Sequence, residues 1–221
     1  MSKEQHKSGK GVAILFLVFA WLIFILLALV FYFYYFDKLD FNAIFGKKET
    51  TETVDTAKPS YETNADVAIN SLVVEYYTAL AICDQAKLKT LVTDPSQFDD
   101  MSPYQRTANK ITNYANVNCY TLPGYTEDGT VCYVICNLTI ADVQSSPLNI
   151  SRMYIVKDAS GNYKIDNSSP SQELDAFLDT QDANPDIQDL YKKVRDDIDR
   201  CVASDEKFAA FYNEINAQPG N

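Results

Sequence analysis

The fold is decided by the stretch CYTLPGYTEDGTVCYVICNLTI, residues 119–140, in which two apolar runs flank a turn sequence. The second run has apolar side chains at every other position, namely Cys132, Val134, Cys136, Leu138 and Ile140. A period of two places these side chains on one face of a β-strand. The residues YTEDGT between the runs are typical of a hairpin turn. We therefore predict an antiparallel hairpin with these five side chains facing a core.

The hairpin extends into a larger sheet. Its arms are predicted over residues 112–122 and 130–143, and two further segments, 149–158 and 162–167, are also rich in Tyr, Val, Ile and Thr. Composition of this kind, interrupted by turn residues such as DASGN, is typical of β-strands. The sequence thus predicts an antiparallel meander.

Helical patterns precede the sheet. Asn64 is placed to cap a helix in which Val67, Ile69, Val73, Tyr76, Tyr77 and Leu80 follow at helical spacing. Asp84 is placed to cap a short helix, and Ser102-Pro103 is a further start signal.

Helical patterns also follow the sheet. Ser169-Pro170 opens a helix with Gln172 in position for a capping box, and Ser204 is placed to cap a last helix. Between them, Asn184-Pro185 opens a long amphipathic helix with an apolar stripe at Ile187, Leu190, Tyr191, Val194, Ile198 and Cys201. Its connections are short, so we expect the stripe to pack on the domain itself; a partner protein is the alternative. Helices, then a sheet, then helices indicate the α+β class.

The chain begins with a candidate membrane anchor. Residues 11–36 form a run of 26 residues without a charge, long enough as a helix of about 39 Å to cross a hydrocarbon core of about 30 Å. A cleaved signal peptide has a shorter apolar region, of about 7–15 residues. Lys3, Lys7 and Lys10 precede the run and favour a cytoplasmic N-terminus. We predict a retained, single transmembrane helix with the C-terminal domain outside the cytoplasm.

The domain organisation follows from these patterns. We assign residues 1–10 to a cytoplasmic tail, 11–36 to the transmembrane helix, 37–64 to a juxtamembrane linker, 65–169 to the main domain and 170–221 to a C-terminal helical extension. The linker is rich in Thr, Glu and Lys, a composition that does not support a packed core.

The segments VVEYYTALAICDQAKLKTLV, YTLPG, VCYVICNLTI and MYIVKDASGNYKI, in this order, resemble the nuclear-transport-factor-2-like cone fold. They look most like uncharacterised membrane-anchored members from clostridial-type Gram-positive bacteria. The resemblance covers residues 65–167 and implies a curved antiparallel sheet that wraps with the N-terminal helices around a pocket. Because members of this superfamily use the cone as an enzyme pocket, a dimer surface or a scaffold, the resemblance implies no single activity.

Charge and residue usage exclude several functions. Without Lys3, Lys7, Lys10 and Glu4 of the tail, the 19 basic and 30 acidic residues of the chain become 16 and 29, a net charge of −13. Such a surface repels nucleic acid, which we exclude as a partner. The single histidine, His6, lies in the tail, so the domain has no histidine for proton transfer. An Asp–Tyr mechanism stays open, with Asp84, Asp99 and Asp100 near the helical end of the domain.

The five cysteines, Cys83, Cys119, Cys132, Cys136 and Cys201, all follow the apolar run. Cys132 and Cys136 are about 13 Å apart along a strand, too far for a disulfide or a shared zinc ion. Pairing of Cys119 with either depends on a register that the sequence leaves open. The acidic runs DTQDANPD and DDIDR lack the pattern of an EF-hand loop, and we interpret them as solvated helix faces. We therefore predict no metal, cofactor or catalytic residues.

Two function classes remain. The first is a non-catalytic binding or scaffold module of the cell envelope, whose partner is an envelope protein or a second copy of the chain, by analogy with scaffold components of conjugation and secretion machines. The second is a pocket for a small apolar ligand or substrate, which a cavity lined by tyrosines with an aspartate at its base would favour.

Overall fold

The computed structural model describes residues 58–217, which belong to one compact unit. The predicted tail, the transmembrane run 11–36 and most of the linker lie outside the described residues. None of the helices within residues 58–217 combines the length and the hydropathy that crossing a bilayer requires. The described chain is α+β, as predicted, with one antiparallel sheet and six α-helices.

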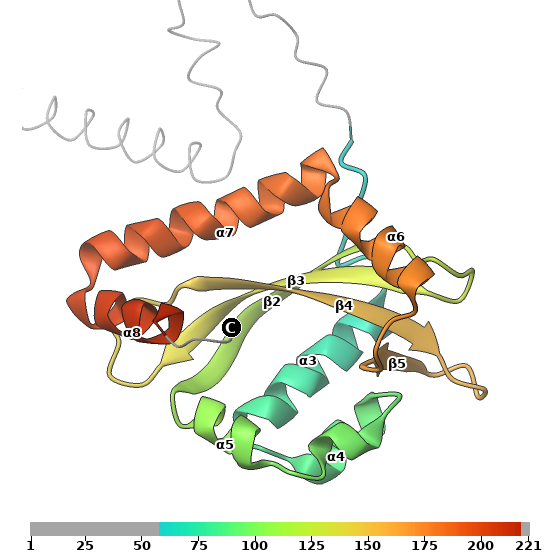
Figure 1. Ribbon diagram of the computed structural model, residues 1–221, viewed down its shortest axis with the longest axis horizontal. Helices are drawn as coiled ribbons and strands as arrows, with labels where there is room; N and C mark the ends of the chain where they lie inside the picture. The colour runs from blue at the N-terminus through green and yellow to red at the C-terminus, as the bar shows by residue number, and fades with distance from the viewer. Residues whose placement is uncertain (1–57, 218–221) are drawn as a thin grey trace, which may run out of the picture. The chain divides into compact units, whose positions relative to one another are not determined.

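The sheet has five strands in the order β1-β2-β3-β4-β5, each antiparallel to its neighbours (Figure 1). The strands are β1 Glu62–Thr63, β2 Ile111–Pro123, β3 Thr130–Ile140, β4 Leu148–Lys157 and β5 Tyr163–Asp166. The meander of β2 to β5 confirms the prediction from the sequence pattern. The short β1 lies in the stretch assigned to the linker and pairs with the end of β2.

The turn between β2 and β3 depends on a glycine. The N–H of Gly124 donates to the carbonyl of Gly129 at 3.0 Å. A Cβ on Gly124 would lie 2.3 Å from the carbonyl carbon of Gly129, which is closer than any side chain tolerates. The two glycines therefore let the chain reverse within YTEDGT, as the sequence predicts.

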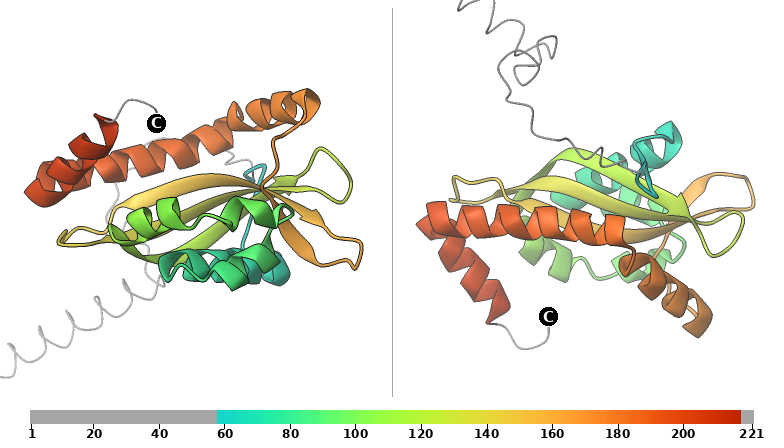
Figure 2. Two further views of the ribbon diagram at one scale, coloured as in Figure 1. Left: turned by 60° about the horizontal axis from the view of Figure 1, so that its bottom comes forward. Right: turned by 90° about the horizontal axis from the view of Figure 1, so that it is seen from above.

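Helices cover both faces of the sheet (Figures 1 and 2). One face carries α3 Val67–Ala81, α4 Gln85–Leu91, the 3-10 helix η1 Pro95–Phe98 and α5 Ser102–Ala108. The other carries α6 Gln172–Asp182, α7 Pro185–Ser204 and α8 Glu206–Asn216. Figure 2 shows the sheet between the two helical layers.

Two main apolar clusters lie on the two sides of the sheet. Cys132, Val134 and Cys136 of β3 face α3 and α4, as the alternation predicts, whereas Val131, Tyr133 and Ile135 face α6 and α7. The stripe of α7 packs in this second cluster, which confirms intramolecular docking. Ile140 was expected on the α3 side and instead contacts Cys201 and Phe208, because α8 covers that end of β3.

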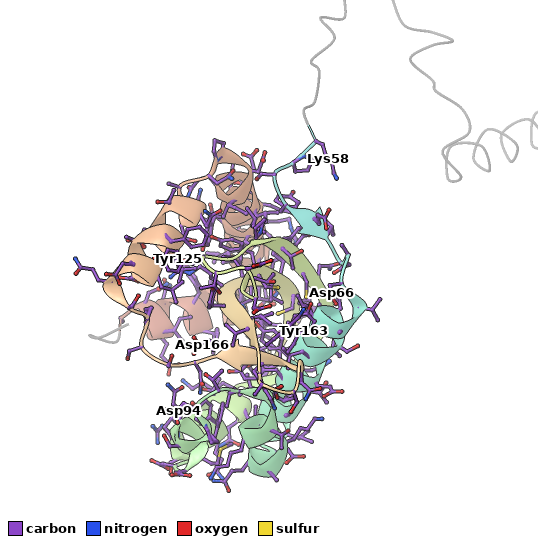
Figure 3. All side chains as sticks on the ribbon, turned by 90° about the vertical axis from the view of Figure 1, so that its right-hand side faces the viewer. Lys58, Asp66, Asp94, Tyr125, Tyr163 and Asp166 are labelled. Atoms are coloured by element: carbon purple, nitrogen blue, oxygen red, sulfur yellow. The ribbon has the colours of Figure 1, made fainter. Side chains whose placement is uncertain are left out.

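The helix starts were predicted with mixed success. Asp84 caps α4 and Asn184 caps α7, as expected. Asn64 does not cap α3: its φ is 51° and its side-chain oxygen accepts the N–H of Cys119 at 2.8 Å. Asp66 is the cap instead, and its second carboxylate oxygen accepts the hydroxyl of Tyr163 at 2.9 Å (Figure 3).

The N-caps of two C-terminal helices, α6 and α8, also differ from the predicted residues. Ser171, and not a capping box from Ser169 to Gln172, caps α6. Asp205, one residue after Ser204, caps α8. Asp205 is the better choice because its second oxygen also accepts two N–H groups of the loop after β3.

Candidate functional site

A cavity of about 440 Å³ lies between α3 and the sheet. Its volume falls within the range of about 300–1,000 Å³ that is usual for small-molecule sites. The lining residues come from α3, from strands β2 to β5 and from the position after β5: Tyr76, Tyr77, Leu80, Ile111, Tyr114, Leu138, Asn149, Ser151, Arg152, Met153, Tyr154, Ile165, Asp166 and Asn167. It is the candidate site because α3 and the sheet form it together and because it opens to solvent, so that a small molecule can enter it.

Three tyrosines form an aromatic wall of the cavity. The ring of Tyr77 lies 4.8 Å from that of Tyr114 and 5.8 Å from that of Tyr76, measured between centroids. The hydroxyl of Tyr77 is 2.6 Å from the hydroxyl of Ser151 on β4. Aromatic faces and a few fixed hydroxyls suit a flat, mostly apolar molecule.

The charged residues of the lining are engaged elsewhere. Arg152 pairs with Asp182 at the end of α6, on the other side of the sheet. Asp166 accepts the hydroxyls of Thr93 at 2.8 Å and Ser168 at 2.6 Å. Burial alone would raise the pKa of Asp166, but these hydrogen bonds outweigh it and hold the pKa below its usual value. Asp166 is therefore a carboxylate at neutral pH and a weak base.

The tyrosines of the cavity are neutral phenols. Burial raises the pKa of Tyr76 to about 12, and burial likewise raises the pKa of Tyr77 and of Tyr114. A phenol that stays protonated donates hydrogen bonds and does not remove protons at neutral pH. These three phenols thus offer aromatic surface and hydrogen-bond donors to the cavity.

The aspartates considered for an Asp–Tyr mechanism do not line the cavity. Asp84 caps α4, Asp99 forms an ion pair with Lys89 at 2.5 Å, and Asp100 accepts the N–H of Ser102 at 2.9 Å. The aspartate that lines the cavity is Asp166, which was not among the aspartates predicted from the sequence. Its position depends on the register between β4 and β5, and only the flanking pattern NYKIDN hinted at a strand there.

The cysteines of the sheet are buried thiols. Cys119, Cys132 and Cys136 are at most 1% exposed and face α3. The register places Cys119 opposite Val134, so it directly opposes neither of the other two. Burial raises the pKa of Cys136 to about 11, and a hydrogen bond with Cys119 together with burial raises the pKa of Cys132. Cys132 and Cys136 are therefore protonated thiols at neutral pH, and protonated thiols are poor nucleophiles.

The acidic runs of the C-terminal helices were predicted to be solvated faces, but two of their aspartates contact the sheet. Within DTQDANPD, Asp182 accepts the hydroxyl of Tyr133 at 2.6 Å and pairs with Arg152. Within DDIDR, Asp197 accepts the N–H of Leu148 at 2.8 Å. These two aspartates bind the sheet rather than solvent. Among residues 58–217, no three ligating side chains converge in a way that would hold a metal ion.

A scan against protein-family models, a search of the curated proteins and a search of the solved structures each found no match to this chain. The candidate site is therefore defined by its own geometry.

The buried phenols predict unfolding at alkaline pH. The folded domain raises the pKa of Tyr76, Tyr77, Tyr114 and Tyr133 above the unfolded value of about 10. Below pH 10 both states are protonated; above it the unfolded chain loses protons that the folded chain keeps, so stability falls as pH rises. We expect tyrosinate absorbance and loss of circular dichroism to rise together above pH 10. Complete ionisation of the tyrosines near pH 10 with native dichroism would contradict this.

Proposed function

We propose that the chain is a membrane-anchored protein whose extracytoplasmic domain binds a small, uncharged, largely apolar ligand without transforming it. The uncharged run 11–36 and the three lysines before it support the anchor and its orientation. The cavity between α3 and the sheet is the observation that carries the binding function.

The lining indicates the chemistry of the ligand. Tyr76, Tyr77 and Tyr114 offer aromatic surface, and Leu80, Leu138 and Met153 offer aliphatic surface. Because the phenols stay protonated, they favour a ligand with a hydrogen-bond acceptor such as a carbonyl or ether oxygen. An anionic ligand is disfavoured, since Arg152 is already paired with Asp182.

The chemistry of the domain favours binding over catalysis. The domain sequence contains no histidine, the phenols of Tyr76, Tyr77 and Tyr114 are protonated, and the raised pKa values of Cys132 and Cys136 keep these thiols protonated at neutral pH. A relation to the nuclear-transport-factor-2-like cone fold is part of this proposal. Its support is the order of the elements and the cavity between α3 and the antiparallel sheet.

A copurification experiment tests this function. The full-length chain would be extracted from membranes in mild detergent, and bound small molecules would be identified by mass spectrometry. Leu80→Trp adds bulk inside the cavity, whereas Leu174→Trp adds the same bulk to α6 in the cluster on the opposite face. We expect a compound in near-stoichiometric amount in the wild type and in Leu174→Trp, reduced at least tenfold in Leu80→Trp.

Two outcomes would overturn the proposal. One is equal recovery of the compound from Leu80→Trp and the wild type, which would place it outside the cavity. The other is the absence of any bound compound from the wild type together with no thermal shift from a panel of neutral aromatic and aliphatic molecules.

A further inference from the structure

The outward face of α3 exposes apolar side chains that nothing in residues 58–217 covers. Val67 is 77% exposed, Val74 is 46% exposed, and Ile82, the C-cap of α3, is 70% exposed. One other large hydrophobic residue of the described chain, Tyr125, is comparably exposed. Three of the four therefore gather on a single helix, on the side turned away from the sheet.

These residues belong to one continuous stripe. At 100° per residue, Val67, Ser71, Val74, Thr78 and Ile82 fall within an arc of about 80°. The hydroxyl of Ser71 donates to the carbonyl of Val67 and that of Thr78 to the carbonyl of Val74, both at 2.8 Å. Because both hydroxyls are satisfied within the helix, they leave mainly carbon atoms at the surface. The stripe of α3, defined by these five residues, is thus more apolar than its sequence suggests.

Charge distinguishes this stripe from the remainder of the surface. The chain carries 30 acidic and 19 basic residues, but α3 carries a single charge, Glu75, at the edge of the stripe. When two copies of an acidic protein associate about a two-fold axis, each charge near the axis approaches the identical charge on the other copy. An uncharged surface avoids this repulsion, so the stripe is suited to contact with a second copy of the chain.

The order of side chains along the stripe is the same in both directions. The sequence of types is aliphatic, hydroxyl, aliphatic, hydroxyl, aliphatic, centred on Val74. The successive spacings of four, three, four and four residues are those of a helix-packing seam. In an antiparallel pair with its two-fold axis between Val74 and Glu75, Val67 meets the partner's Ile82 and Ser71 meets the partner's Thr78. Ser71 and Thr78 are small enough for close approach, and the carboxylate of Glu75 is paired with Lys87 of its own chain at 2.7 Å.

We propose that α3 is a homodimer contact, in which two copies of the chain pack their α3 stripes antiparallel about a two-fold axis beside Val74. The 15 residues of α3 extend about 22 Å. A single helix pair of that length buries less surface than the roughly 1,200 Å² of a standard stable interface, so the dimer is weak in dilute solution. Anchoring both copies in one membrane raises their effective concentration, and the contact forms there. This dimer goes beyond the proposed ligand binding; it rests on the membrane anchor of the proposed function and does not require the cavity to be occupied.

Crosslinking in membranes tests the contact. Val74→Cys would be introduced into the full-length chain and oxidised with copper phenanthroline. The wild type, which keeps Cys83 beside Ile82, sets the background, and Lys193→Cys on the exposed side of α7 is the matched control. We expect a band of two chains for Val74→Cys at least tenfold above both. No such band would overturn the proposal.

A charge exchange gives a second, independent readout. Val74→Lys and Val74→Glu each place like charges close together beside the two-fold axis, so each variant alone should lose the dimer. Coexpression of the two should restore a dimer that contains one chain of each. Because Val74 is half exposed, we expect the melting temperature of each variant to match the wild type. Dimers that persist in the single variants, or that fail to return in the mixture, would contradict α3 pairing.

Discussion

Removal of residues 170–221 from the full-length chain is expected to abolish folding of the domain that begins at residue 58. The C-terminal helices bury four apolar side chains against the sheet, each at most 5% exposed: Leu178, Ile187, Leu190 and Val194. At about 1.5–3 kcal/mol each, their burial contributes about 6–12 kcal/mol, comparable with the whole net stability of a domain. The deletion would also expose Val131, Tyr133 and Ile135 of the central strand.

Circular dichroism and limited proteolysis of the truncated chain measure this effect. Ile187→Ala, which removes part of one fully buried side chain, should cost about 2–5 kcal/mol and lower the melting temperature of an otherwise folded domain. Lys193→Ala, on the exposed side of the same helix, should change little. A truncated chain that melts at the wild-type temperature would show that the helices contribute nothing to the domain.

The strands could be predicted from the sequence because their apolar period and turn residues are local signals. The arms 112–122 and 130–143 fall within a few residues of β2 and β3. The covering of both faces of the sheet was harder to predict, because a strand pattern shows which side chains share a face but not what packs on it. Tyr133 illustrates this: it points away from Cys132 and is still fully buried, under α6 and α7.

The candidate site could be predicted less well than the fold. Tyr76 and Tyr77 were assigned to the core from helical spacing, and they do pack against it, yet the same rings line the cavity. Ser151 and Asp166 reach the site through strand register, which depends on pairings that lie far apart in the sequence. Aspartates were interpreted from neighbouring residues alone, and so the sheet-binding role of Asp182 was missed.

The second large effect is expected from Asp182→Ala. Asp182 receives the hydroxyl of Tyr133, a residue that is fully buried, and pairs with Arg152, whose side chain is 27% exposed. The substitution leaves a buried hydroxyl and a partly buried guanidinium without their acceptor. Such losses cost about 1–3 kcal/mol for each buried group, and partial exposure of Arg152 reduces its share, so we expect about 2–3 kcal/mol in all. For a domain of this size that corresponds to a melting temperature lower by roughly 5–10 °C.

A double-mutant cycle separates the contact from a general weakening of α6. Tyr133→Phe removes the hydroxyl, and in the Asp182→Ala background it should cost less than in the wild type or even restore stability, because the hydroxyl there has no acceptor. Asp179→Ala, on the exposed side of α6, is the matched control and should leave the melting temperature within about 2 °C of the wild type. Strictly additive effects of Tyr133→Phe and Asp182→Ala would mean that the two side chains do not interact. A coupling of 1 kcal/mol or more would instead make Asp182 the residue that joins the end of α6 to the centre of the sheet, since Tyr133 lies in the middle strand and Arg152 on the next.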